Sequence, residues 1–222
     1  MSCSILRWFF TSAIDNMSQF FQIHPDNPQQ RLINHAVEII NDGGLVVYPT
    51  DSSYAIGCHI GDKRALDRLR MLRQLNSKHH FTLMCRDLSE IANYAKISNS
   101  AYRLLKSHTP GPYTFILTAT HEVPRRLLSG KRKSIGIRVP NNKIMLALLE
   151  ALGEPLMSTT LILPNDDEPM CDPYEIKDVI SEQVDLIIDG GYCGFDLTTV
   201  VDLIDDDPKV LREGLGDAST FS

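Results

Sequence analysis

The sequence predicts a three-layer α/β/α domain of the α+β class, built on a twisted mixed β-sheet. Short apolar runs typical of strands intermix with amphipathic runs typical of helices, without the strict strand–helix–strand period of a parallel sheet. The 222 residues are 43% hydrophobic and 23% charged, which is sufficient for one large core. The sequence shows no internal repeat and no linker that would divide it.

The first half of the chain is expected to start with a helix over residues 32–40. Its apolar residues recur at helical spacing, after an Asp-Asn-Pro start and before an Asp-Gly-Gly stop. Residues 45–48 form a continuous apolar run that predicts a buried strand, closed by Pro49. A second strand over residues 54–60 and a charged amphipathic helix over residues 62–73 follow.

The rest of the chain continues the mixture of short strands and helices. Proline and glycine turn signals, such as Pro110-Gly111-Pro112, separate the elements. Strands are predicted over residues 81–85, 113–118, 134–139, 157–163, 186–188, 199–204 and 210–212. Helices are predicted near residues 87–95, 98–107, 142–152 and 173–181.

The composition excludes several classes of protein. A net charge of −6 disfavours a chain coated in nucleic-acid-binding charge, although a local basic groove remains compatible with it. No apolar run approaches the roughly 20 residues that a membrane span needs. The five cysteines are scattered and lack a C-x-x-C spacing, which predicts reduced thiols rather than a zinc site or disulfides. We therefore expect a cytoplasmic protein with no membrane contact, no metal site and no tightly bound cofactor.

The N-terminus is considered separately from the domain. Residues 1–16 contain a short apolar cluster with one arginine, too brief and too weakly flanked for a signal peptide. Met17 begins a second stretch that reads as an alternative start. The expectation is an N-terminal extension over residues 1–16, either an included upstream start or a genuine extension, followed by one domain over residues 17–222.

Hydroxyl groups and arginines at strand ends are the main candidates for a ligand site, because the common phosphate-binding and metal-binding motifs are absent. Residues 48–54 leave an apolar strand and enter a polar loop that contains Thr50 and Ser52. The alternative is a turn in which Asp51 and Ser52 only cap local backbone groups. Arg138 and Arg212 each end a predicted strand, and the arginine fork suits phosphate and carboxylate groups. Either could equally be an ordinary surface arginine.

Three hydroxyl residues also open the strand predicted over residues 157–163. Strand periodicity places Ser158 and Thr160 on one side, and Ile162 is expected to continue that side. A basic stretch elsewhere provides candidates for contact with RNA phosphates. These residues are Arg125, Arg126, Lys131, Arg132 and Lys133. A solvated loop is the alternative interpretation of this stretch.

Four motifs occur in order along the chain. They are Tyr48-Pro49-Thr50-Asp51-Ser52-Ser53-Tyr54-Ala55-Ile56-Gly57, Thr109-Pro110-Gly111-Pro112-Tyr113-Thr114, Arg138-Val139-Pro140, and Thr198-Thr199-Val200-Val201-Asp202 with Arg212-Glu213-Gly214. They resemble the P-T-D-S/T-x-Y-G/A-L/I-G, P-G-P-x-T, R-I/V-P and S-T-V/I-x-D…R-x-G motifs of the YrdC/YciO superfamily. The similarity runs from about Met17 to the C-terminus and is greatest to the YciO subgroup.

The resemblance implies a twisted mixed sheet with a concave, positively lined face. The best-known activity of the superfamily is the synthesis of threonylcarbamoyl-AMP from threonine, bicarbonate and ATP, for transfer RNA modification. ATP with Mg²⁺ would be a substrate, and positioned cations would stabilise the phosphates. Family members are also described as binding double-stranded RNA. The implied nucleotide- and substrate-binding residues are Thr50, Ser52, Tyr54, Arg73, Arg138, Ser158, Thr160, Thr198 and Arg212.

Two motifs of the synthases are altered here. Their K-x-R aligns with Arg73-Gln74-Leu75, and their S-x-N aligns with Thr160-Leu161-Ile162. Each lost hydrogen bond to a charged ligand group costs about 1.5 to 3 kcal/mol. The resemblance therefore implies a protein that binds a nucleotide, double-stranded RNA or both, with weak or absent synthase activity. One alternative is a working threonylcarbamoyl-AMP synthase, which would also bind threonine. A third is a ribosome- or partner-associated scaffold that keeps only the fold.

Overall fold

The structure is a computed structural model that describes residues 17–76, 79–128, 133–205 and 207–221. The strands are β1 (Gln19–Gln22), β2 (Val46–Tyr48), β3 (Ala55–His59), β4 (Thr82–Met84), β5 (Ala95–Lys96), β6 (Tyr113–Ala119), β7 (Ser134–Arg138), β8 (Leu156–Thr160), β9 (Leu186–Asp189), β10 (Thr199–Asp202) and β11 (Lys209–Arg212). The α-helices are α1 (Gln30–Asn41), α2 (Lys63–Leu72), α3 (Leu88–Tyr94), α4 (Asn99–His108), α5 (Lys143–Leu152) and α6 (Pro173–Ile180). The expected extension over residues 1–16 lies outside the described residues.

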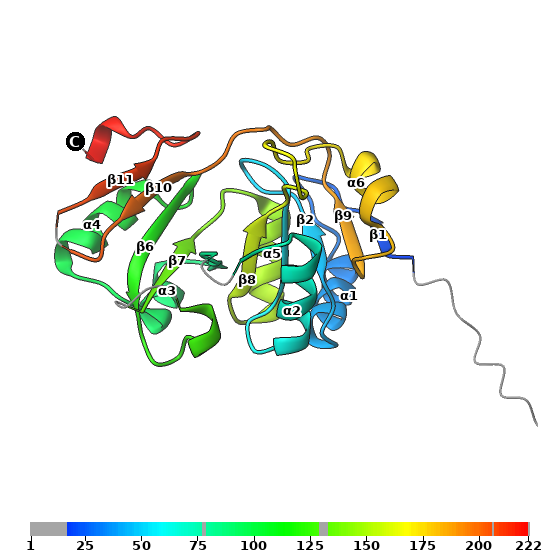
Figure 1. The fold of residues 1–222 in the computed structure, drawn as a ribbon, viewed down its shortest axis with the longest axis horizontal. Coiled ribbons are helices and arrows are strands. Elements are labelled where there is room, and N and C mark those ends of the chain that lie inside the picture. Colours follow the sequence, from blue (N-terminus) through cyan, green and yellow to red (C-terminus); the bar gives the residue numbers. More distant parts are fainter. Residues whose placement is uncertain (1–16, 77–78, 129–132, 206, 222) are drawn as a thin grey trace, which may run out of the picture.

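One sheet connects all eleven strands of the described part of the chain (Figure 1). Their order is β1-β9-β2-β3-β8-β4-β7-β6-β10-β11, and β5 pairs with β6. Parallel pairs, such as β4 with β7 and β6 with β10, occur beside antiparallel pairs, such as β3 with β8. The predicted mixed sheet is therefore confirmed.

Helices pack on both faces of the sheet, because alternate residues of each strand enter two different apolar clusters. Val46 and Tyr48 of β2 belong to the cluster that contains α1 and α5, whereas Val47 belongs to the cluster that contains α2, α3, α4 and α6. Asp62 and Ser98 start their helices by accepting a hydrogen bond from a backbone N–H three residues ahead. This arrangement confirms the three-layer α/β/α fold.

The α1/α5 layer covers only part of its face of the sheet. Its apolar cluster includes residues of β2, β3, β4, β8 and β9, but its described members include none from β6, β7 or β10. On these strands, Phe115 and Ile137 enter the opposite cluster, while their neighbours Thr114 and Arg138 line a pocket. The uncovered part of the face is therefore the place where polar side chains collect.

The predicted elements match the structure closely, apart from β1, the end of β8 and the two-residue strand β5, which lies where the end of a helix was predicted. Strand β1 was not expected, because its four residues carry no alternation or turn signal; it pairs in parallel with β9. Strand β8 ends at Thr160 rather than at residue 163, because the amide of Ile162 donates to the carbonyl of Thr160 at 3.1 Å and turns the chain. Ile162 therefore does not continue the side shared by Ser158 and Thr160. Among the described residues, no helix has the length and apolar character that crossing a membrane requires.

Candidate functional site

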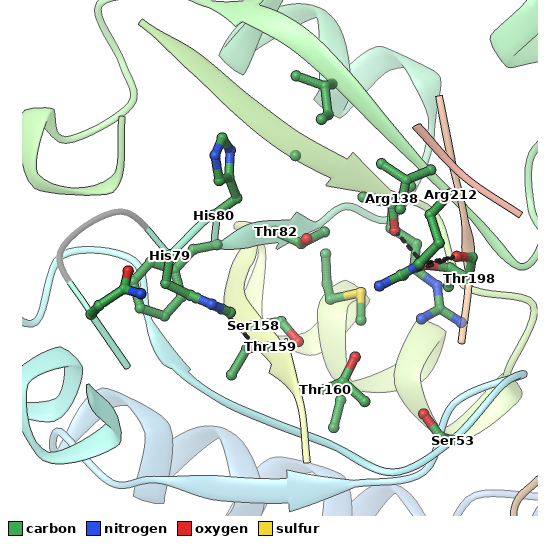
Figure 2. Close-up of a pocket in the computed structure, with 18 residues that line it drawn as sticks. Ser53, His79, His80, Thr82, Arg138, Ser158, Thr159, Thr160, Thr198 and Arg212 are labelled. Atoms are coloured by element: carbon green, nitrogen blue, oxygen red, sulfur yellow. Dashed lines mark hydrogen bonds between the residues drawn. The ribbon is translucent and has the colours of Figure 1, made fainter. Parts of the chain in front are cut away.

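A pocket of about 450 Å³ opens on the uncovered face of the sheet. Figure 2 shows Arg138 and Arg212 on one side of the pocket, His79 and His80 on the other, and Thr82, Ser158 and Thr160 between them. Strands β3, β4, β6, β7, β8, β10 and β11 all contribute to the lining. The volume lies in the range of roughly 300 to 1,000 Å³ that is usual for small-molecule sites.

Arg138 lies at the end of β7 and is only 5% exposed. Its Nη2 donates to the hydroxyl of Ser52 at 3.0 Å, to the hydroxyl of Thr50 at 3.3 Å, and to the carboxylate of Asp51. The loop before β3 therefore holds this guanidinium in place. Thr50 and Ser52 act on the pocket through Arg138, since neither lines it.

The pairing of Arg138 is incomplete. Its Nε is buried and has no hydrogen-bond partner among the described residues, and the same is true of Oδ2 of Asp51. An ion pair removed from water is strong only when its remaining donors and acceptors are also satisfied. A ligand that accepts hydrogen bonds from the guanidinium would complete this arrangement.

Arg212 reaches the same end of the pocket from β11. Its Nε and Nη2 donate to the carbonyl of Thr198 at 3.1 and 2.9 Å, and the hydroxyl of Thr198 lies 2.9 Å from that of Thr114. Burial and, after it, the positive charge of Arg138 lower the pKa of Arg212. The two guanidinium groups are therefore close enough to repel each other, and an anion between them would relieve that repulsion.

Two motif glycines permit the close packing around the site. A Cβ at Gly57 would lie 2.5 Å from the carbonyl oxygen of Met157 and 2.9 Å from the hydroxyl of Tyr48. That hydroxyl donates to Oγ of Ser158 at 2.6 Å and so orients a pocket hydroxyl from within the core. Likewise, a Cβ at Gly214 would lie 2.3 Å from a backbone carbonyl oxygen beside Thr198.

His79 defines the opposite end of the pocket. Its Nε2 lies 3.0 Å from the hydroxyl of Thr159, and its ring meets the ring of Phe81 edge-on at a centroid distance of 5.1 Å. Burial, followed by the charges of Arg73 and His80, lowers the pKa of His79 to about 4. The imidazole is therefore neutral at pH 7.

Tyr54 and Arg73, like Thr50 and Ser52, do not line the pocket. Tyr54 is fully buried, and its hydroxyl donates to the carbonyl of Gly191 at 2.8 Å on the core side of β3. Arg73 follows α2, and burial lowers its pKa to about 10. Five predicted residues do meet in the pocket: Arg138, Ser158, Thr160, Thr198 and Arg212.

The residues of the predicted RNA-binding stretch lie in different surroundings. Lys131 and Arg132 lie outside the described residues. The guanidinium of Arg126 donates to the carbonyls of Ile60, at 3.1 Å, and Gly61, so it ties its segment to the turn before α2. The exposed residues Arg125 and Lys133 line a separate surface hollow with Lys96 and Thr118.

Sequence reasoning missed several pocket residues, among them Thr82, Thr114, Thr159 and His79. The alternation of polar and apolar residues along β4 and β6 was a usable signal for Thr82 and Thr114. No comparable signal marked His79, which approaches from the chain that precedes β4. Among the described residues, no group of three or more His, Cys, Asp or Glu side chains is placed to hold a metal ion.

Comparison with known proteins connects this geometry to one family. A family model named for Sua5, YciO and YrdC, with the description "Telomere recombination", matches residues 38–214. The uncharacterized protein YciO of Escherichia coli K12 is 63% identical over 205 residues, which are 92% of this chain and the whole of that protein. A threonylcarbamoyl-AMP synthase of Klebsiella pneumoniae is 30% identical over 149 residues, 66% of this chain and 77% of that enzyme.

Solved structures agree with the sequence relatives. The crystal structure of E. coli YciO has a TM-score of 0.90 and covers 93% of this chain and all of its own. P. abyssi Sua5 complexed with L-threonine has a TM-score of 0.82 at 24% identity, covering 89% of this chain and 58% of its own, a likeness of fold. The match over most of the chain, the close relatives and the shared fold lead to one conclusion: this chain belongs to the Sua5/YciO/YrdC family.

Proposed function

We propose that this chain binds a nucleotide by its phosphate in the concave pocket and has weak or absent threonylcarbamoyl-AMP synthase activity. The observation that carries the proposal is the pair of guanidinium groups, Arg138 and Arg212, at one end of a pocket rich in hydroxyl groups. Planar, charge-assisted donors of this kind are the usual protein partners of phosphate.

The residues in the two altered motifs support the proposal that synthase activity is weak or absent. Arg73 and Leu75 stand at the K-x-R positions, and neither lines the pocket. Leu75 packs against the apolar core, and Ile162 lies beyond the end of β8. Leu75 and Ile162 carry no charged or amide group, and Arg73 lies outside the pocket lining, so the transition state of adenylate formation would lack contacts that the synthase motifs imply.

Isothermal titration calorimetry with a panel of ribonucleotides tests the binding proposal. We expect at least one nucleotide to bind the natural protein, with affinity reduced about 10- to 100-fold in Arg138→Ala. Arg126→Ala is the matched control, because it removes the same side chain from outside the pocket. A protein that binds no nucleotide, or whose affinity is equal in both variants and the natural chain, would refute the proposal.

Synthesis of threonylcarbamoyl-AMP is the second candidate, favoured by the identity to the K. pneumoniae synthase. It requires pyrophosphate release that depends on threonine, bicarbonate and ATP, with Mg²⁺ supplied alongside ATP. We expect little or no release above a control that lacks threonine. A robust threonine-dependent release that Arg138→Ala abolishes would replace the first candidate with this one.

We also propose that the chain binds double-stranded RNA, at a surface separate from the pocket. Arg125, Lys133 and Lys96 present positive charge beside β6, whereas Arg126 is engaged with backbone carbonyls. A mobility shift with duplex RNA over a salt series measures this binding, because phosphate contacts weaken as salt rises. A double Arg125→Ala, Lys133→Ala variant that shifts RNA as well as the natural protein would exclude this surface.

A further inference from the structure

A hollow of about 600 Å³ lies beside α6, and its described lining shares no residue with the concave pocket. Three segments form it: the chain between β8 and α6 (yellow in Figure 1), one side of α6, and the loop that precedes β10. Glu175 and Val179 are one helical turn apart on α6, so they line the hollow together. Phe195 lines it from the loop before β10. The described chain thus has a second concave surface, separate from the first.

Apolar side chains in this hollow are open to solvent. Val179 is 49% exposed and Phe195 is 50% exposed. Leu163 and Met170 contribute further apolar surface from the chain after β8. The ring of Phe195 meets the ring of Tyr192 edge-on at a centroid distance of 6.1 Å, and Tyr192 is itself 65% exposed. Exposed apolar side chains that gather at a concavity are typical of a surface that a partner covers.

Acidic side chains surround this apolar surface. Four exposed carboxylates line the hollow: Asp166, Asp167, Glu168 and Glu175. None of them forms an ion pair with a described residue. Lys177 is the only Lys or Arg between residues 144 and 208 of the sequence, and its ammonium group lies over the ring of Phe20, 5.0 Å from the centroid. The hollow therefore carries negative charge for which the described chain supplies no ion-pair partner.

The combination of charge and apolar surface selects among the classes of partner. Nucleic acids and anionic membranes are repelled by the carboxylates. A symmetric dimer through this hollow would place the acidic side chains of one copy against those of the other, since the same patch meets itself across a two-fold axis. A peptide with Lys or Arg beside apolar side chains suits both features, because its cations pair with the carboxylates while its apolar groups cover Val179 and Phe195.

We propose that the hollow beside α6 is a docking site for a short basic segment of a protein partner, in which Lys or Arg flank an apolar residue. The apolar residue of the partner lies against Val179 and Phe195, and its cations pair with Asp166, Asp167 and Glu168. This interaction uses neither the concave pocket nor the basic surface beside β6, so it is independent of the proposed function. Its affinity falls as salt rises, because exposed ion pairs are screened.

Selection from a displayed library of random dodecapeptides on the natural protein tests the proposal. We expect the enriched peptides to contain Lys or Arg on both sides of an aliphatic or aromatic residue. Fluorescence polarisation of the same peptides, synthesised with a dye, should show an affinity that decreases as NaCl is added. The absence of any enriched peptide, or enrichment of peptides without basic residues, would overturn the proposal.

A charge variant and a matched control locate the binding. The charge variant is Asp166→Asn/Asp167→Asn/Glu168→Gln, and it should bind the selected peptides about tenfold more weakly. The control removes the same charge from exposed positions outside the hollow and should stay within about twofold of the natural protein; it is Glu38→Gln/Asp42→Asn/Glu182→Gln. An equal loss of affinity in both variants would reveal attraction to an acidic protein in general, and would overturn the docking site.

A second pair of variants tests the apolar contact. Phe195→Ser removes the exposed ring and should also weaken peptide binding about tenfold, whereas Tyr102→Ser, which removes an exposed ring from α4, should leave it unchanged. Melting curves verify that both variants are folded. Unchanged binding in Phe195→Ser, or displacement of the peptide by an equal concentration of spermine, would mean that charge alone acts and would refute the proposal. A dimer of the natural protein that the charge variant dissociates, seen by sedimentation, would assign the hollow to a second copy of the chain instead.

Discussion

Arg138 and Arg126 are two arginines in different environments, and the sequence made both of them candidates for phosphate contact. Each guanidinium makes several hydrogen bonds and each has a buried Nε without a partner among the described residues. Arg138 bonds to side chains and faces a pocket, whereas Arg126 bonds to the backbone carbonyls of Ile60 and Gly61. Burial and bonding alone therefore do not separate a binding arginine from a structural one; the space that the guanidinium faces does.

The largest effect is expected when Arg138 is removed. Arg138→Ala leaves the nearly buried carboxylate of Asp51 without its cation, which should cost about 3 to 5 kcal/mol of the free energy of unfolding. Urea denaturation measures this loss. The double variant Asp51→Asn/Arg138→Met removes both charges at similar volume and should recover most of the stability.

The double variant also separates folding from binding at this site. Its nucleotide affinity should stay as low as that of Arg138→Ala, because the phosphate partner is still missing. Recovery of binding together with stability would show that Arg138 acts only by holding its loop, and would remove the contrast with Arg126.

A smaller loss is expected at Arg126, and in stability alone. Arg126→Ala removes two bonds to carbonyls that join two segments, which should lower the free energy of unfolding by about 1 to 3 kcal/mol. Nucleotide affinity should stay within about twofold of the natural protein, within the scatter of such measurements. Arg125→Ala, at the exposed neighbouring position, should change neither quantity. A clear loss of nucleotide affinity in Arg126→Ala would contradict the view that Arg126 has only a structural role.

The smallest expected effect is the contribution of His79 to the pH dependence of stability. The folded-state pKa of His79, about 4, lies below the ordinary value of 6.5. Between these values the unfolded chain binds more protons, so stability is fully present above pH 6.5 and falls as the pH approaches 4. For a partly exposed ring, a contribution of about 1 kcal/mol is reasonable after solvent screening.

Urea denaturation of His79→Gln at pH 7 and pH 4.5 isolates this contribution. The variant should lose about 1 kcal/mol less than the natural protein between the two values, since the carboxylates are common to both. His121→Gln is the control, because that side chain is 92% exposed. A loss equal to that of the natural chain would show that the ring of His79 is not held neutral by the fold.

Much of the fold follows from local signals in the sequence. The alternation of apolar residues and the turn residues located most elements to within two residues, because many elements are followed by a stop such as Pro140 or Gly153. Strand β1 was not predicted, because its formation depends on pairing with β9, which is far away in the sequence. The end of β8 was misplaced because an apolar run continued past the turn at Thr160.

The site was less accessible to sequence reasoning than the fold. Residues of β7, β8 and β11 meet in the pocket only through the order of strands in the sheet, and the similarity to a family, not any spacing, grouped them. Tyr54 shares a motif with Thr50 but its ring turns to the opposite side of the sheet. His79 is positioned by Thr159 across a tertiary contact that no local pattern encodes.

Along single strands of the uncovered face, alternate residues face the core and the pocket. Leu83 and Phe115 face the core, and their replacement disturbs packing; Thr82 and Thr114 are their immediate neighbours and line the pocket. A mutation at one of the latter can change what is bound without repacking anything beneath it. Such a surface lets one scaffold acquire a new ligand through a few point changes, because stability and recognition are encoded at alternate positions of the same short strands.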